Sequence, residues 1–478
     1  MSFVPQQNPI NARGDAMSQI VSDIVNCEHQ IHKFFQNQKI GSLLKRSNIN
    51  KEKGVAPVAV FRAVFNLAFT GKNLFRTMTA DRCCGMAKDT VYRFLNSIHT
   101  NWRRFLLLLS SRVIRDEIEP LTGAANMKVL VADDTLYRRN RSKKVELLSR
   151  VFDHTDGRYY RGFRMLVLAW SDGISFLPVS CALLASGKEK NRFVPPRTDI
   201  DRRTNGAVRR RESIRKATDV LVEMVAEAKA SGIRASHLLF DSWFAYPAIM
   251  RKLLAKGVHT LCMLKITETI RYHFEGEEFH LAAIYRQIRK RRGRAKILAS
   301  VMVEIGEDDK GLPVSAKVVF VRDRHSKKWL ALLSTDTTLS DEEIITTYKR
   351  RWDIEVFFKV AKSFLNLAKE CQGRSYDALV AHATIVCCRY IMLALAKRIN
   401  QDPRTLGTLF HACCEELQQV TFAEALALFL SLLERVLGDT PEMTRELLRS
   451  LIGRFLRELP PIYGARWLLE WHNDVAYC

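Results

Sequence analysis

Two short apolar runs, each followed directly by an acid, constrain this chain more than any other feature of its sequence. Met127–Ala132 ends in Asp133-Asp134-Thr135, and Ser236–Phe240 ends in Asp241. Short continuous apolar runs of this kind are typical of strands that are buried in the middle of a sheet. Residues at the carboxyl ends of such strands converge on one crevice, so we expect the acids to lie close together.

The elements around these runs predict an α/β domain. Gly162–Trp170 and Ile174–Ala185 are strand-like, and Ser171-Asp172-Gly173 between them is a hairpin turn signal. Helical and strand-like patterns then alternate over Glu212–Ala230, Ser236–Phe240, Tyr246–Ala255 and His259–Lys265. The predicted order is therefore three strands, helix, strand, helix, strand.

The flanking regions have a different pattern. Residues 1–125 carry apolar side chains at helical spacing, whereas Lys296–Glu304, Ala316–Arg322 and Trp329–Ser334 alternate like strands. The predicted segments are a helical DNA-binding region at 1–125, the first part of a catalytic core at 126–270, a β-rich insertion at 271–338, the second part of the core at 339–400 and a helical C-terminal region at 401–478. Within the first segment, Met86–Asn96 fits either a helix-turn-helix or a plain helical hairpin.

The charge of the chain favours a polyanionic partner. It has 75 Lys and Arg against 51 Asp and Glu, a formal net charge of +24. Nucleic acid is the first candidate and an anionic membrane surface the second. No apolar run reaches the roughly 20 residues that a membrane span needs, and the N-terminus has no charged start followed by an apolar run. We therefore expect no membrane partner and a cytoplasmic protein, associated with the nucleoid when bound to DNA.

Two stretches concentrate the positive charge. Lys188–Arg215 holds ten Lys or Arg against four acids, and Arg286–Lys296 holds seven and no acid. A charged run is most often a solvated face. In a chain of this net charge, with both stretches flanking the acid-ended strands, we interpret them as phosphate contacts.

A third acid stands in the segment from Tyr348 to Lys362. On one helix, Tyr348, Arg351, Glu355, Lys359 and Lys362 would fall in a stripe roughly 80° wide, with apolar residues on the adjoining face. An ordinary amphipathic helix with i,i+4 ion pairs, each worth about 0.2–0.5 kcal/mol, would look the same. Cleavage of a phosphodiester, however, needs an activated nucleophile, a stabilised leaving oxygen and neutralised phosphate charge. Two divalent ions held by Asp134, Asp241 and Glu355 would supply all three.

The spacing Tyr-(2)-Arg-(3)-Glu-(6)-Lys, met by Tyr348, Arg351, Glu355 and Lys362, resembles the signature of the bacterial DDE transposases of insertion-sequence family four. The resemblance covers roughly residues 127–400. It implies an RNase H-like catalytic core and cut-and-paste DNA transposition. It also implies that Asp134, Asp241 and Glu355 are the catalytic acids, which bind two Mg²⁺ or Mn²⁺ ions. Asp133 is an alternative to Asp134, but the family pattern of an acid followed by Thr favours Asp134.

The same resemblance implies roles for residues around the acids. Tyr348, Arg351 and Lys362 would bind phosphates near the transposon end, with Lys359 beside them. Trp329 occupies the place of an aromatic residue in the insertion that stacks on a flipped base, the alternative being a core strand residue. The implied partners are double-stranded DNA, as terminal inverted repeats and as target, and a second copy of the chain in the DNA complex.

Two other functions are compatible with the same residues. One is a stand-alone Mg²⁺-dependent nuclease on the same fold, which the sizeable N- and C-terminal helical regions disfavour. The other is a transposase-derived DNA-binding protein without catalytic activity, which the presence of all three acids disfavours.

Overall fold

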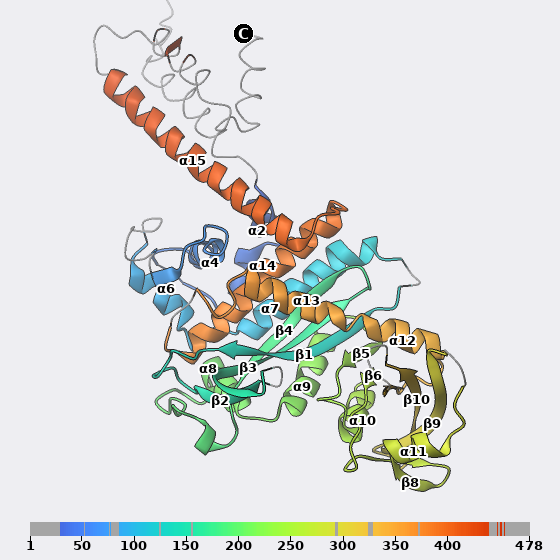
Figure 1. The fold of residues 1–478 in the computed structure, drawn as a ribbon. Helices are drawn as coiled ribbons and strands as arrows, with labels where there is room; N and C mark the ends of the chain where they lie inside the picture. Colours follow the sequence, from blue (N-terminus) through green and yellow to red (C-terminus); the bar gives the residue numbers. More distant parts are fainter. Residues whose placement is uncertain are drawn as a thin grey trace, which may run out of the picture. The chain divides into compact units, whose positions relative to one another are not determined.

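The computed structural model describes residues 29–438, apart from 52, 76, 78–85, 124–125, 154–155, 292–294, 324–327 and 371–372, and also residues 447, 450, 451 and 454. The chain divides into two compact units. The larger is Gln38–Gly407, and the smaller combines Met1–Asn37 with Thr408–Cys478. The larger unit contains every predicted site residue, and its helices and strands are drawn in Figure 1.

The helices lie mainly at the two ends of the chain and between the strands of its middle part. Their bounds are α2 (Gln30–Asn37), α3 (Ile40–Arg46), α4 (Pro57–Asn66), α6 (Lys88–Leu95), α7 (Trp102–Val113), α8 (Asn205–Ser213), α9 (Ala217–Ala230), α10 (Pro247–Ala255), α11 (Leu281–Gln287), α12 (Asp341–Lys349), α13 (Trp352–Ser363), α14 (Tyr376–Ile399) and α15 (Leu406–Gly438). Helix α2 and all but the first two residues of α15 belong to the smaller unit.

A single mixed sheet forms the centre of the larger unit. Its strands are β1 (Val129–Arg138), β2 (Ser149–Asp153), β3 (Arg158–Ser171), β4 (Phe176–Leu184), β5 (His237–Phe240), β6 (His259–Met263), β7 (Arg271–Phe274), β8 (Glu277–His280), β9 (Ile297–Glu307), β10 (Pro313–Arg322) and β11 (Trp329–Ser334). The strand order is β2-β3-β1-β5-β6-β11-β10-β9-β7-β8, and β4 pairs with β3. Strand β1 runs antiparallel to β3 and parallel to β5, which is parallel to β6.

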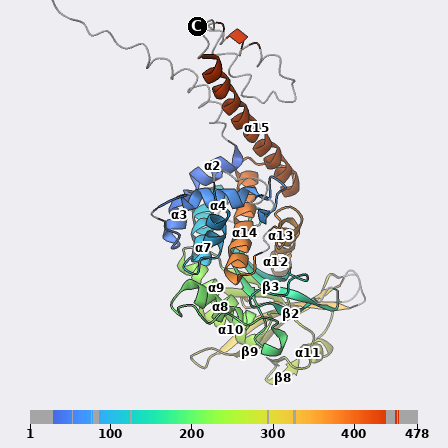
Figure 2. The ribbon, with the colours of Figure 1, turned by 90° about the vertical axis from the view of Figure 1, so that its left-hand side faces the viewer.

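This arrangement is that of an RNase H-like core and confirms the predicted fold class. Strands β1, β3, β4, β5 and β6 contain the predicted apolar runs, whose residues are mostly buried. Helices α7, α13 and α14 cover one face of this part of the sheet, and α9 and α10 lie on the other (Figures 1 and 2). With both faces covered, strands need not alternate apolar and polar residues, which is why these appear as continuous runs.

The predicted β-rich insertion extends the same sheet. Strand β11 pairs antiparallel with β6, and β10 and β9 follow outward from β11. These three strands match the expected alternating segments, whereas β7, β8 and α11 were not predicted. Their segments are only 4 to 7 residues long, too short for a periodic pattern to stand out.

The prediction of one continuous helix over Tyr348–Lys362 is wrong. Helix α12 ends at Lys349 and α13 begins at Trp352. Between them the backbone closes i to i+3 hydrogen bonds, from Arg351 N to Tyr348 O and from Asp353 N to Arg350 O, which wind the chain more tightly than an α-helix. The Arg350 side chain donates to Met127 O at 2.7 Å, and this contact with the segment just before β1 links the junction to the sheet.

Helix α14 is much longer than the apolar run Ala378–Cys388 in its middle. By length and composition alone, Tyr376–Ile399 could cross a membrane, but its apolar window is completely buried inside the protein. Helix α14 is therefore the core helix of the larger unit, and its apolar composition is explained by its burial. The possible helix-turn-helix falls partly on residues 78–85, outside the described residues, and only its second helix, α6, is described.

Candidate active site

The candidate site lies where β1 runs past the end of its neighbour. Strand β1 pairs with β5 only over Val129–Val131, and β5 ends at Phe240. The second half of β1 therefore borders the space beyond β5 and β6. A cavity of about 830 Å³ opens here. Its lining residues are Asp133, Asp134, Thr135, Leu136, Arg138, Val151, Phe152, Asp153, Arg164, Asp241, Ser242, Trp243, Lys265, Lys362, Leu367, Ala368 and Lys369.

Asp133 is connected through Arg351 to Glu355 of α13, which we call the Glu helix. The Arg351 guanidinium donates from Nη1 to Asp133 Oδ2 at 3.3 Å and from Nη2 to Glu355 Oε1 at 2.6 Å. Counted on from the β1–β5 register, Asp133 is level with Asp241, so both side chains are expected on the same face of the sheet. Asp133 and Asp241 thus both line the cavity, and Arg351 links Asp133 to Glu355.

The neighbouring Asp134 has different partners. Its Oδ1 accepts a hydrogen bond from Arg164 Nη1 at 2.6 Å, and the Asp134 side chain is only 9% exposed. Successive side chains of a strand point to opposite faces, so Asp134 and Arg164 lie on the face away from Arg351. The prediction that Asp134 is the metal ligand is not favoured by this geometry, because Asp133 and not Asp134 contacts the arginine that holds Glu355.

The charge state of Asp133 reflects its surroundings. Burial raises the pKa of its carboxyl to about 7, and the negative charge of Asp241 acts in the same direction. Arg351 and the backbone N–H of Asp134 lower this pKa again, but do not cancel the increase. A carboxyl that is destabilised in its charged form by burial and by another acid is typical of functional sites.

The other signature residues divide between the cleft and its surroundings. Lys362 lines the cavity and donates to Thr135 Oγ1 at 2.6 Å, and burial lowers the pKa of its ammonium group. Tyr348 is half-buried, with the Arg351 guanidinium 5.9 Å from its ring centroid, and burial raises the pKa of its phenol. Lys359 is exposed and lines a different cavity, with Ile174 of the β3–β4 hairpin and Lys397 of α14. The break between α12 and α13 and the packing of α13 thus separate Lys359 from the cleft.

Trp329 lies at the start of β11 and packs against other aromatic residues. Its ring is stacked on Tyr285 of α11 with centroids 4.4 Å apart, and it meets Phe320 of β10 edge-on at 5.3 Å. One face of the indole is therefore covered by the insertion itself. This contact favours the alternative interpretation, a strand residue packed in the insertion, over base stacking.

The three acids fit a divalent cation by their donor chemistry. Carboxylate oxygens are the ligands that Mg²⁺ and Mn²⁺ prefer. Among the described residues, no three acid, His or Cys side chains converge closely enough to form a metal site. Instead, the Arg351 guanidinium stands between Asp133 and Glu355, where a cation would be expected. The acids therefore attract positive charge at this point.

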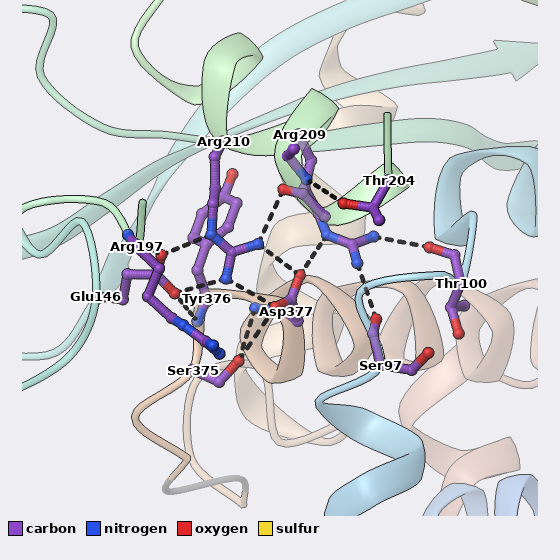
Figure 3. Close-up of polar contacts among 12 residues, drawn as sticks. Ser97, Thr100, Glu146, Arg197, Thr204, Arg209, Arg210, Ser375, Tyr376 and Asp377 are labelled. Carbon is purple, nitrogen blue, oxygen red and sulfur yellow. Dashed lines mark hydrogen bonds and ion pairs between the residues drawn. The ribbon is translucent and has the colours of Figure 1, made fainter. Parts of the chain in front are cut away.

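Most cations of the basic stretch Lys188–Arg215 are paired with acids, some of them buried and some at the surface. Arg210 of α8 forms ion pairs with Glu146 at 2.6 Å and with Asp377 at 2.7 Å, and Arg209 pairs with Asp377 at 2.6 Å (Figure 3). Six of its ten cations form ion pairs: Arg192–Glu189, Arg197–Asp199, Arg203–Asp201, Arg209–Asp377, Arg210–Glu146 and Arg215–Glu223. In Arg286–Lys296, the other stretch interpreted as a phosphate contact, Arg286, Arg289 and Lys296 are exposed.

Two cleft residues, Arg164 and Trp243, were missed by sequence reasoning. Arg164 is the only charged residue between Gly162 and Trp170, in an otherwise apolar strand. Trp243 comes two residues after Asp241. Either position could have signalled a role, because a charge within an apolar strand and an aromatic residue beside an acid both need a specific environment.

Comparison with known proteins agrees with this geometry. Residues 71–307, with Asp133, Asp134 and Asp241, match a family model described as "DDE superfamily endonuclease". Residues 300–381, with Glu355, match one described as "Archaeal putative transposase ISC1217". No curated protein matches the chain. The two matches together cover the sheet and α13. Over these residues the chain is similar to a DDE endonuclease and to a putative transposase, which supports a transposase-like nuclease.

Proposed function

We propose that this protein is a metal-dependent DNA transposase of the cut-and-paste type. In this reaction, phosphodiester bonds at the ends of the element are hydrolysed, and the freed 3′-hydroxyl groups then attack target DNA. The observation that carries the proposal is that Arg351 joins Asp133 to Glu355 beside a cavity that Asp133 and Asp241 line, in an RNase H-like sheet.

Asp133, Asp241 and Glu355 would hold the Mg²⁺ or Mn²⁺ ions. When bound, two such ions activate the attacking oxygen and stabilise the leaving 3′-oxygen. We assign the first acid to Asp133, whereas the sequence pattern favours Asp134, because Asp134 is engaged by Arg164. Asp134 would instead orient Arg164 at the wall of the cleft.

The cations around the acids would hold DNA. Arg351 and Lys362 lie next to the acids, and their charges can pair with phosphates on either side of the bond that is cut. Tyr348 would support Arg351 through the contact of its ring with the guanidinium. The substrates would be the terminal inverted repeats of an element and a target duplex. Two ends must be cut, so a homodimer on DNA is expected, in the bacterial cytoplasm.

A plasmid that carries the gene with its native flanking DNA tests the proposal. Purified protein with Mg²⁺ should release the element and join it to a second plasmid, whereas Glu355→Gln should bind the same DNA and cut none of it. Cleavage without joined products would indicate a stand-alone nuclease, and DNA binding without cleavage by the wild type an inactive derivative. Equal cleavage by Glu355→Gln and wild type would overturn the mechanism.

A further inference from the structure

Two arginines lie directly opposite each other where β2 pairs with β3: Arg150 and Arg161. Like charges at such a position repel each other and destabilise a sheet. Among the described residues, neither guanidinium has an acidic partner. Instead, the guanidinium carbon of Arg150 lies 4.1 Å from the ring centroid of Tyr159, and that of Arg161 lies 4.8 Å from the ring centroid of Phe193. The rings orient the two charges without neutralising them.

The other face of the same hairpin shows the opposite behaviour. Arg138 forms ion pairs with Asp153 and Asp156, both at 2.8 Å. Arg138 is level with Gly162 of β3, so its side chain points to the face opposite that of Arg161. The acids of the hairpin therefore neutralise a cation on one face and leave the two arginines of the other face unpaired.

The arginine pair shares a face of the sheet with Asp133. Asp133 is level with Val167 of β3, and Arg161 comes an even number of residues before Val167, so both side chains point to the same face. Six residues of strand span roughly 20 Å, which corresponds to about six nucleotides of a DNA strand. Phe152 lines the cleft and packs edge-on against Tyr159 at 5.0 Å. The aromatic ring beneath the pair thus contacts the wall of the cleft.

The loop between β1 and β2 brings further positive charge to this place. Asn140 Oδ1 accepts a hydrogen bond from the backbone N–H of Arg161 at 3.2 Å, so the loop runs beside the pair. Arg141, Lys143 and Lys144 of the same loop are exposed, and none of them has an acidic partner in the part of the chain that the structure describes. A concentration of unneutralised cations beside a nuclease cleft attracts a polyanion.

We propose that Arg150 and Arg161 form a clamp for a backbone phosphate of duplex DNA, within about six base pairs of the bond that is cut. This inference rests on the proposed function and specifies the path of its DNA substrate, which leaves the cleft over the paired strands β2 and β3. Two adjacent guanidinium groups can hold one phosphate through several N–H donors, and the phosphate would relieve their mutual repulsion. Contacts to phosphate carry no sequence information, so the clamp would bind any duplex that passes through the cleft.

Salt titrations of binding to a labelled random-sequence duplex, in Ca²⁺ to avoid cleavage, test the clamp. Arg150→Gln combined with Arg161→Gln should lower affinity. It should also reduce the magnitude of the slope of log K against log salt concentration by at least about 0.9, the value for one phosphate. Arg150→Lys combined with Arg161→Lys keeps both charges and should keep most of the slope. Arg203→Gln combined with Arg215→Gln is the matched control and should bind like wild type, because both arginines pair with acids of the protein.

Photocrosslinking locates the clamp relative to the cut. Tyr159 is 57% exposed and its ring faces Arg150, so a p-benzoylphenylalanine in its place would lie beside the bound phosphate. The protein is irradiated in Ca²⁺ on an end-labelled fragment of the DNA that flanks its gene. The crosslinked nucleotide should lie within about six nucleotides of the position that wild type cuts in Mg²⁺. Crosslinks only to more distant DNA, or no crosslinks, would overturn the proposed path.

The remaining outcomes separate the clamp from a structural role and from the proposed function. Removal of two opposed charges should leave the midpoint of urea unfolding unchanged or higher. An unchanged salt slope in Arg150→Gln with Arg161→Gln would overturn the clamp, and a lower urea midpoint in the same variant would assign the arginines to the fold. If wild type still cuts DNA in that case, only the clamp is wrong. A reduced slope together with no cleavage by wild type would leave the arginines as DNA contacts and overturn the proposed function.

Discussion

Adjacent carboxyls on one strand have different partners in this site. Asp133 contacts Arg351, which also holds Glu355, whereas Asp134 contacts Arg164 on the other face of β1. Their sequence neighbourhood is nearly identical, so the alternation of the strand alone decides which carboxyl meets the Glu helix.

This difference predicts unequal effects of two similar substitutions. Asp133→Asn should reduce Mg²⁺-dependent cleavage to background, because it removes a metal ligand. Asp134→Asn should lower cleavage only about 10- to 100-fold, as loss of a residue that supports the metal ligands from outside typically does. Cleavage rates of both variants, with circular dichroism as the folding control, check the assignment. The opposite ranking would restore Asp134 as the ligand.

The two lysines of α13 should also differ. Lys362 lines the cleft and Lys359 lines another cavity. Lys362→Ala should therefore weaken binding to DNA. Loss of one phosphate contact should also reduce the magnitude of the slope of log K against log salt concentration by about 0.9. Lys359→Ala serves as the matched control and should leave the slope unchanged. Equal losses in the two variants would show that both lysines contact phosphates.

At the scale of elements, the segment after α13 is held by the core helix α14. Asn366 and Ala368 have φ of 60° and 64°, a left-handed conformation that non-glycine residues seldom adopt. Arg389 donates to Leu365 O at 3.0 Å, and His382 contacts Asn366 O at 3.2 Å. Since Ala368 lines the cleft, buried residues of α14 help to shape the wall of the active site.

His382 makes the stability of this region depend on pH. Burial and the charge of Arg389 lower the pKa of its imidazole from 6.5 to about 3. Below pH 6.5 the unfolded chain therefore binds a proton that the folded protein does not, and the free energy of unfolding should fall by up to about 1.4 kcal/mol per pH unit as pH drops toward 5.

Urea unfolding of wild type and His382→Gln at pH 7, 6 and 5 measures how much His382 contributes to the pH dependence of the free energy of unfolding. The variant keeps an N–H donor for Asn366 O, and its stability should decrease less steeply with falling pH. Glu370, 3.6 Å from His382, is present in both proteins, so its own titration affects both curves. Parallel curves would mean that His382 does not contribute.

The buried ion pairs of α8 link it to the N-terminus of α14. Arg210 is 4% exposed, and Glu146 and Asp377 are 7% and 1% exposed. Arg210→Ala would leave two buried carboxylates short of positive charge, and should lower the free energy of unfolding by about 3–5 kcal/mol. Arg203→Ala removes an ion pair whose arginine is 90% exposed, and should change stability by no more than about 1 kcal/mol. Denaturant unfolding of the two variants and the wild type measures both changes in the free energy of unfolding. Equal changes in the two variants would contradict the prediction.

At the scale of the whole molecule, the cations behind the net charge of +24 differ in their surroundings: some form ion pairs with acids of the protein, and others face solvent. Substituting Arg289 and Lys296, both exposed in the insertion, with Gln should reduce the salt slope of DNA binding by up to about 1.8. The same change at Arg197 and Arg203, which pair with Asp199 and Asp201, should have little effect. Titrations at several salt concentrations test this contrast, which would disappear if both stretches bound DNA equally.

Local patterns in the sequence predicted the order of strands and helices in the core, and the resemblance to DDE transposases implied that this core is RNase H-like. The runs before Asp133 and Asp241, the hairpin at Ser171–Gly173 and the strands of the insertion were predictable, because burial on both faces or on one leaves a pattern within a few residues. Asp241 follows β5 as predicted, whereas Asp133 and Asp134 lie in the middle of β1, which continues to Arg138. Glu355 was predicted from the spacing of the cations around it and from the resemblance. The short segments β2, β7 and β8 were not.

The tertiary structure alone decided which side chains share the cleft. It placed Asp133 beside Arg351, sent Lys359 to another cavity, packed Trp329 against Tyr285 and joined Arg209 and Arg210 to Asp377. It also brought Arg164 and Trp243 together. Each of these contacts joins different elements of the fold, several of them more than a hundred residues apart. Periodicity and local hydrogen bonding determine elements, whereas the partner of a side chain depends on how those elements pack.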